Sequence, residues 1–290
     1  MIISERLEHY EKLMRLDKPI GILLLLWPTL WGLWLAADGT PNLAIVWVFV
    51  LGTVLMRSAG CVINDYADRN FDPHVERTKD RPLATGVVST KEALLLAAGL
   101  SFCAFLLILS LNRLTIVLSV CALFLAASYP FTKRFFVIPQ AYLGIAFSFG
   151  IPMAFAAQTN ELPIVVWLLM TANLFWVVAY DTEYAMVDKA DDLKIGIKTS
   201  AISFGRLDVA GTMLCHIIFL GIMISVGQIQ KLGVIYYVGL GAALGLIMYQ
   251  YHLIHDRMPE RCFKAFLHNN WVGATVFICI VLDYLIETTF

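Results

Sequence analysis

Most of this chain consists of apolar segments that are each long enough to cross a lipid bilayer. Of its 290 residues, 59% are hydrophobic and 15% are charged, whereas an average soluble domain has about 25% charged residues. A membrane-spanning helix needs about 20 apolar residues, and many segments here meet that length. The pattern predicts an all-α polytopic membrane protein. We expect nine spans, at about residues 19–37, 42–64, 92–111, 114–131, 137–157, 163–187, 207–228, 232–253 and 266–286.

The basic residues divide unequally between the two sides that nine spans define. If the N-terminus is cytoplasmic, 18 of the 21 lysines and arginines lie on the cytoplasmic side. Only Arg113 and Lys231 lie on the other side, and Arg57 falls inside a span. Because cytoplasmic loops carry an excess of basic residues, we expect a multi-pass protein of the bacterial inner (cytoplasmic) membrane. Its N-terminus and its acidic loops are expected in the cytoplasm, and its C-terminus across the membrane.

The first 18 residues differ from the rest because charged and apolar residues alternate there. Four apolar residues recur at helical spacing, namely Ile3, Leu7, Tyr10 and Met14. That spacing predicts a short amphipathic helix lying in the membrane interface. No soluble segment or linker follows, so we expect residues 1–290 to form a single integral-membrane domain, with 1–18 as its interfacial segment. No basic tract suggests a nucleic-acid partner.

A polar stretch follows the second predicted span. Asn64, Asp68 and Asp72 recur at every fourth residue, and Arg57 lies seven residues before Asn64. On a helix, spacings of four and seven bring side chains onto one face. The stretch therefore predicts a helical stripe that carries a guanidinium, an amide and two carboxylates, with Arg57 deepest in the membrane.

A second polar stretch, after the sixth span, has a similar pattern. Asp181, Asp188 and Asp192 repeat the seven-then-four spacing, while Arg77 and Arg81 follow the first stretch. Ten of the 22 acidic residues fall in the two windows 64–81 and 181–192. Carboxylates crowded in this way need a counter-cation, or their pKa values must rise.

Paired carboxylates beside arginines suit the binding of a diphosphate through a divalent metal. Mg²⁺ takes oxygen ligands and commonly binds through a few carboxylates together with substrate phosphates. Arginine and lysine hold phosphate oxygens. A diphosphate held by both can leave with its charge neutralised. An allylic cation formed in this way is destroyed by water, so an apolar, aromatic-walled pocket in the membrane would protect it.

The motifs resemble those of a known family. The first stretch reads Asn64-Asp65-x-x-Asp68-x-x-x-Asp72, and the second reads Asp188-x-x-x-Asp192 after Tyr180-Asp181. Both are similar to the two aspartate motifs of the intramembrane aromatic prenyltransferases, the UbiA superfamily. The runs DKPIGILLLLWPTLW, LMRSAGC and SYPFTKR further resemble the branch that prenylates 4-hydroxybenzoate in ubiquinone biosynthesis. The resemblance covers essentially the whole chain.

This resemblance implies a fold, a cofactor and roles for particular residues. The fold would be nine transmembrane helices around a central cavity with a lateral opening to lipid. Mg²⁺ and the diphosphate of a polyprenyl diphosphate would be held by Asn64, Asp68, Asp72, Asp188 and Asp192. Further diphosphate contacts would come from Arg77, Arg81, Lys133 and Arg134. Arg57 would hold the carboxylate of the aromatic acid, and Asp181 would orient acceptor or metal.

The reaction that the resemblance implies is transfer of the polyprenyl group to a ring carbon of 4-hydroxybenzoate. That carbon is ortho to the hydroxyl and meta to the carboxylate, and diphosphate is released. Other branches remain open, with 1,4-dihydroxy-2-naphthoate, homogentisate or a haem as acceptor. A different class, a cation transporter, would place its acidic residues near the bilayer midplane, whereas here they follow the ends of spans. The sequence leaves chain length and oligomeric state open.

Overall fold

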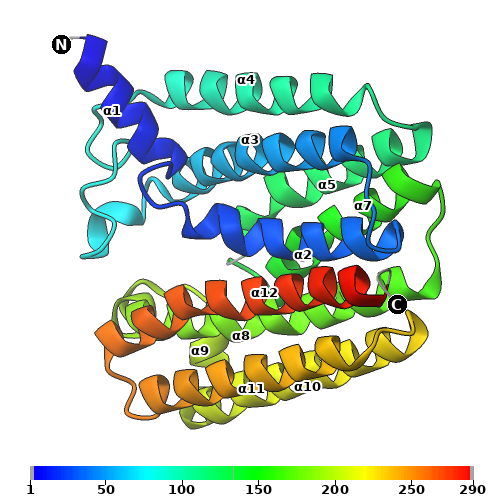
Figure 1. Cartoon of the computed structure of the whole chain (residues 1–290). Helices are drawn as coiled ribbons and strands as arrows, with labels where there is room; N and C mark the ends of the chain where they lie inside the picture. The colour runs from blue at the N-terminus through cyan, green and yellow to red at the C-terminus, as the bar shows by residue number, and fades with distance from the viewer. Residues whose placement is uncertain (1–2, 133, 288–290) are drawn as a thin grey trace.

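The structure is a computed structural model that describes residues 3–132 and 134–287, and their regular elements are all helical. The long helices run side by side in one bundle, with chain direction alternating (Figure 1). In chain order the elements are α1 (Ile3–Met14), α2 (Ile20–Ala36), α3 (Leu43–Asp68), η1 (Asp72–His74), α4 (Thr90–Ile108), α5 (Arg113–Thr132), α6 (Pro139–Ser148), α7 (Gly150–Thr159), α8 (Ile164–Ile195), α9 (Ser200–Ser203), η2 (Gly205–Leu207), α10 (Asp208–Ile229), α11 (Val234–Ile254) and α12 (Pro259–Glu287).

Each of the nine predicted spans corresponds to helix in the described residues. Eight helical segments are long and apolar enough to cross a membrane by length and composition, with α6 and α7 counted as one segment, Pro139–Thr159. The ninth is α2, which has 17 residues, at the lower limit of about 17–25 residues for a transmembrane helix. The chain is therefore a multi-pass membrane protein.

The predicted span 137–157 is not one continuous helix, because it breaks at Phe149 between α6 and α7. Pro152 explains the break. It has no N–H to donate to the carbonyl of Ser148, and its ring clashes with that carbonyl. The two halves nevertheless follow each other across the bundle, so this segment still makes one crossing.

Two predicted boundaries were wrong, and in both cases the helix is longer than predicted. The span expected to end near residue 187 continues as α8 to Ile195, where Gly196 at φ 75° ends it. The last span begins at Pro259 instead of residue 266. The extra turns of α12 bury Cys262 and Ala265 in a cluster with Ala185 and Met186 of α8. The extra turns of α8 are more exposed, although Asp192 is buried. The whole second polar stretch is consequently helical.

The core lies where α8 meets α2, α10 and α12. Trp31 of α2, Trp176 of α8 and Phe219 of α10 are all fully buried. The ring centroids of Trp31 and Trp176 are 5.3 Å apart, and those of Trp176 and Phe219 are 5.8 Å apart. Asn269 of α12 accepts a hydrogen bond from Trp176 Nε1 (3.0 Å) and donates one to buried Glu183 (2.7 Å). These contacts fix the rotation of α8, which carries the second polar stretch.

The amphipathic helix α1 packs on the bundle. Leu13 is fully buried in a cluster with Val62 and Val88, whereas Leu7 remains 61% exposed. Tyr10 donates a hydrogen bond to Glu92 (2.9 Å), the residue that also closes the capping box at the start of α4. The apolar face of α1 is therefore divided between the protein and its surroundings.

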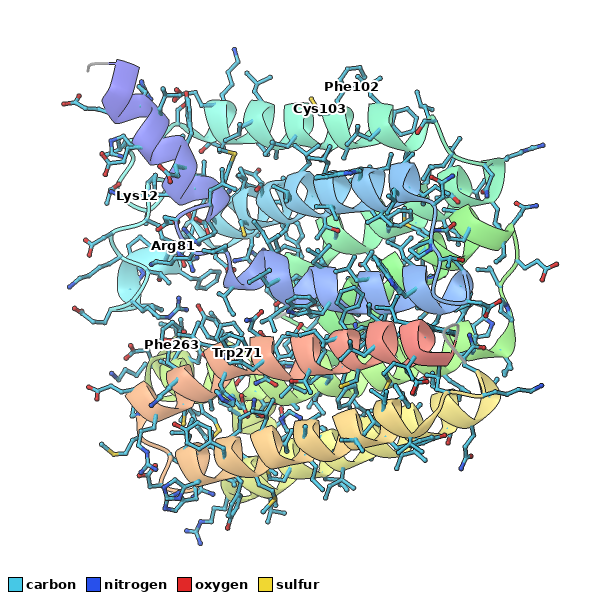
Figure 2. The ribbon with its side chains drawn as sticks, viewed as in Figure 1. Lys12, Arg81, Phe102, Cys103, Phe263 and Trp271 are labelled. Carbon is cyan, nitrogen blue, oxygen red and sulfur yellow. The ribbon has the colours of Figure 1, made fainter. Side chains whose placement is uncertain are left out.

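Both polar stretches lie at one end of the bundle. Figure 1 places α1, the connection from α3 to α4 and the short helix α9 at that end, while the described part of α12 finishes at the other. Lys12, Arg81 and Phe263 lie at the same end, and Phe102 and Cys103 point outward from α4 (Figure 2). Four crossings separate the end of α3 from the end of α8, namely α4, α5, the α6–α7 segment and α8. Because this number is even, both segments lie at the same end of the bundle.

Candidate active site

A large cavity opens between the helices that carry the two polar stretches. It encloses about 1130 Å³, which exceeds the range of about 300–1,000 Å³ for small-molecule sites. Charged side chains from α3, the α3–α4 connection and α8 line one end. The remaining wall is mainly apolar and comes from α2, α3, α4, α5, α6 and α7. Phe105 of α4 and Val120 and Leu123 of α5 line the cavity and are 42–60% exposed, which supports an opening to lipid between these helices.

The first polar stretch reaches the cavity differently from the predicted single stripe. Asn64 and Asp68 are on α3 and line the cavity, and the Asn64 side chain donates to Asp68 Oδ2 (3.3 Å). The helix ends at Asp68, so placing Asp72 on the same helix was wrong. Pro73 gives the reason, because proline breaks a helix interior and disfavours the α conformation of the residue before it. Asp72 lies in η1 and lines the cavity from there.

Arg81 holds Asp72 in place. Its Nη1 lies 3.0 Å from both carboxylate oxygens of Asp72 and 3.0 Å from Asp65 Oδ1. The two carboxylate oxygens of Asp65 also accept hydrogen bonds from Nη2 of Arg15, at 2.9 and 3.0 Å. Burial raises the pKa of the Asp72 carboxyl, Arg81 opposes this, and the nearby carboxylates Asp65 and Asp68 raise the pKa further. Three carboxylates, Asp65, Asp68 and Asp72, therefore lie close together at this end of the cavity, with Arg15 and Arg81 as positive partners.

The second polar stretch faces the first from α8. Asp181, Asp188 and Asp192 all line the cavity. Arg77 crosses to Asp188, with Nη2 at 2.5 Å and Nε at 3.0 and 3.1 Å from its oxygens. Its guanidinium also lies over the ring of Tyr184, 4.6 Å from the centroid. The α3–α4 connection is thus tied to α8 by a residue predicted to contact diphosphate.

Arg57 lies deeper in the same cavity. Its guanidinium lies 5.6 Å from the ring centroid of Phe147, and its buried Nε has no hydrogen-bond partner. A Cβ at Gly21 would come within 2.5 Å of its Nη2, so only glycine allows this close approach to α2. The hydroxyl of Tyr180, 2% exposed on the cavity wall, likewise has no partner. A buried donor without a partner is costly, so both groups indicate a polar ligand.

Two predicted phosphate contacts do not gain support from the structure. Arg134 is not among the residues that line the cavity. It donates to the carbonyl of Ala67 (3.0 Å) and lies between the rings of Phe71 and Phe131. In that position it joins α5 to the end of α3. Lys133 lies outside the described residues.

The sequence interpretation missed Asp65, Arg15 and Gly21. Asp65 belongs to the aspartate-rich motif, but the four-residue spacing drew attention to its neighbours. Its 1% exposure and two arginine partners emerge only after folding. Arg15 follows α1 at φ 58°, and nothing in its sequence context indicates that it turns inward. Gly21 resembled any glycine at the start of an apolar segment.

We expect Asp65→Ala to lower the free energy of unfolding by about 3–5 kcal/mol, because removing one member of a buried ion pair leaves the other charges unpaired. The measurement is the thermal unfolding of the detergent-solubilised protein. Asp191→Ala is the matched control, since Asp191 pairs with Lys194 (3.0 Å) at an exposed site, where an ion pair contributes about 0–1 kcal/mol. Equal stability of the two variants would contradict the structural role of Asp65.

The charged end fits a metal that is bound together with its substrate. Its donors are carboxylate and amide oxygens, as Mg²⁺ prefers. Within the described chain, however, no three acidic, histidine or cysteine side chains converge closely enough to hold an ion. Instead, Asp188 forms an ion pair with Arg77, and Asp72 forms one with Arg81. This arrangement fits Mg²⁺, which is usually bound by one or two carboxylates plus phosphate oxygens and not by a closed protein cage.

Comparisons with known proteins agree with this geometry. The model of a family described as the UbiA prenyltransferase family matches residues 25–273. The chain is 77% identical over 287 residues to the 4-hydroxybenzoate octaprenyltransferase of Nitrosospira multiformis, which covers 99% of each protein. It is 68% identical over 288 residues to the protein of that name from Nitrosomonas europaea, again over 99% of each.

Solved structures share the fold. A UbiA homologue from Aeropyrum pernix K1 in its apo form has a TM-score of 0.80 at 26% identity, covering 90% of this chain and 97% of that one. A UbiA homologue from Archaeoglobus fulgidus bound to GPP and Mg²⁺ has a TM-score of 0.70 at 18% identity, covering 94% and 99%. The described residues therefore share the helical fold of these UbiA homologues.

Proposed function

The chain belongs to the UbiA prenyltransferase family, and from this premise we propose that it prenylates 4-hydroxybenzoate. It transfers a polyprenyl group from polyprenyl diphosphate to the ring carbon ortho to the hydroxyl and releases diphosphate. The observation that carries the proposal is one cavity with three parts. It has a carboxylate–arginine end, the guanidinium of Arg57 farther in, and a long apolar wall. These parts match a diphosphate, an aromatic acid and a prenyl chain.

The diphosphate end is assigned to groups from both polar stretches. Mg²⁺ supplies charge neutralisation to the leaving diphosphate when it is bound. Its protein ligands in this proposal are Asn64, Asp68, Asp72, Asp188 and Asp192. Arg77 and Arg81, which now pair with Asp188 and Asp72, turn to phosphate oxygens when substrate and metal arrive. Lys133 adds a further positive charge, and Arg134 keeps the end of α5 next to α3.

The acceptor is assigned to the middle of the cavity. Arg57 binds the carboxylate of 4-hydroxybenzoate, since a guanidinium and a carboxylate form a bidentate pair. Asp181 lines the cavity from α8 and orients the acceptor. The carbon–oxygen bond of the prenyl diphosphate breaks, and the ring carbon forms a bond to the allylic carbon. The ring proton then passes to an aspartate or to the released diphosphate, which restores aromaticity. Phe147 and Tyr180 exclude water from the cation formed on the way.

Transport of a cation fits the cavity less well. A transport path needs polar groups along its length. Here the carboxylates are concentrated at one end and paired with arginines, whereas the deeper wall holds Phe49, Met56 and Phe105. That wall suits a hydrocarbon chain.

The test is a transfer assay. Membranes containing the protein are incubated with Mg²⁺, a polyprenyl diphosphate and 4-hydroxybenzoate, and the product is identified by its mass. We expect one prenyl group on the ring. Parallel reactions receive 1,4-dihydroxy-2-naphthoate or homogentisate instead. Faster transfer to either compound would show that this compound, and not 4-hydroxybenzoate, is the preferred acceptor. No transfer to any of the three acceptors would reject the proposed reaction.

We further propose that residues 1–290 form one integral-membrane prenyltransferase domain in the bacterial inner membrane, with 1–18 at the interface. The N-terminus and the diphosphate end face the cytoplasm, as the distribution of basic residues predicts. Reporter fusions after Asp38, after Gln158 and at the C-terminus are expected on the non-cytoplasmic side. A fusion after Gly86 should report the cytoplasm. A cytoplasmic signal at the C-terminus would contradict nine crossings.

A further inference from the structure

The cavity continues far beyond the groups assigned to diphosphate and acceptor. On α3 it is lined from Asp68 back to Val48, a distance along the helix axis of about 30 Å at 1.5 Å per residue. Beyond Arg57 the facing wall comes from α4, α5 and α7, with residues such as Phe105, Leu123 and Met153. A ligand that filled this length would be long, thin and apolar.

Two glycines of α3, Gly52 and Gly60, lie on this wall, and neither is required for close contact with a neighbouring helix. A Cβ added at either position would meet no atom within 4 Å. Elsewhere the cavity-lining glycines are needed for close contacts, as Gly21 is for Arg57 and Gly150 for Thr29. Glycine in a helix interior costs roughly 0.5–1 kcal/mol relative to alanine. At Gly52 and Gly60 no neighbouring helix offsets that cost, so the space they leave serves something that the chain alone does not contain.

We propose that Gly52 and Gly60 keep the cavity open for the distal isoprene units and that Gly52 sets which chain lengths are accepted. This inference rests on the proposed function. Gly60 lies about 12 Å and Gly52 about 24 Å from the level of Asp68 along the helix axis. An extended protein backbone advances about 3.5 Å for every three bonds. A prenyl chain has similar bond geometry, so geranyl, with about eight bonds along its main chain, reaches about 9 Å. An octaprenyl chain of about 32 such bonds reaches about 37 Å. Only the longer chain must pass Gly52.

The experiment measures transfer of geranyl and octaprenyl groups to 4-hydroxybenzoate by Gly52→Ala and Gly52→Leu. We expect the ratio of octaprenyl to geranyl transfer to fall stepwise with side-chain size, and by about tenfold or more for leucine, as for added bulk in an apolar pocket. Gly60→Leu should also lower octaprenyl transfer relative to geranyl transfer, because Gly60 lies beyond the about 9 Å that a geranyl chain reaches. Gly241→Leu is the matched control, because Gly241 is an exposed glycine of α11 with equally open space and does not line the cavity.

The outcomes are distinguishable. An unchanged ratio in both Gly52 variants, or an equal loss of both substrates, would overturn the role of Gly52. A fall in the ratio for Gly241→Leu would show that any bulky substitution has this effect and would overturn it as well. Absence of transfer by the unsubstituted protein with either diphosphate would instead reject the proposed function. Gly52→Ala keeps the test valid if the leucine variant does not fold, because alanine favours the helix.

Discussion

Replacing Asp68 or Asp188 with asparagine is expected to lower kcat by at least about a hundredfold, equivalent to a loss of about 3 kcal/mol of transition-state stabilisation. Each substitution keeps the shape of the side chain and removes one negative oxygen ligand. The two residues come from α3 and α8 and line the same cavity from different sides. Loss at both positions would mean that both aspartate motifs act on one diphosphate. The measurement is steady-state transfer across a range of Mg²⁺ concentrations.

Asp191→Asn is the control for this prediction. Asp191 lies on α8 between Asp188 and Asp192, but it pairs with Lys194 and does not line the cavity. Its substitution should leave kcat within about twofold, since exposed ion pairs contribute little. Full turnover in the presence of EDTA would reject the metal. Normal turnover of both Asp68→Asn and Asp188→Asn would reject the assignment of these residues.

Substitution of Arg57 is expected to weaken use of 4-hydroxybenzoate far more than use of polyprenyl diphosphate. A hydrogen bond to a charged group contributes about 1.5–3 kcal/mol, so kcat/KM for the acceptor should fall roughly 10- to 150-fold in Arg57→Ala. Arg57→Lys keeps the charge but loses the planar fork, and it should recover only part of the loss. Steady-state kinetics with each substrate varied in turn separates the two effects.

Gly21→Ala provides an independent check on Arg57. The added methyl group would displace the guanidinium from its place against α2, so it should raise KM for 4-hydroxybenzoate while leaving the charge intact. Equal damage to both substrates in Arg57→Ala would place this residue at the diphosphate end or in the fold. An unchanged response to 4-hydroxybenzoate would remove the carboxylate contact from the proposal.

The sequence by itself determined which segments form membrane-length helices, their approximate positions and the common end at which the polar groups gather. Apolar length and the distribution of basic residues are local properties, and the membrane imposes them on each segment separately. The spacing of Asn64 with Asp68, and of Asp188 with Asp192, was equally readable because each pair lies on one helix. The likeness to UbiA enzymes joined the two motifs into one site.

Only the tertiary structure decided which charges meet. Asp72 does not lie on the predicted helical stripe, because Pro73 prevents the helix from continuing. Its ion pair with Arg81, which also contacts Asp65, places the Asp72 carboxylate beside Asp65. The pairing of Arg77 with Asp188 joins residues 111 positions apart, and no periodicity in the sequence encodes such a distance. The open space beside Gly52 likewise depends on what α4, α5 and α7 do not fill. Spacing along a chain specifies the face of one helix, whereas contacts and cavities arise from the packing of several.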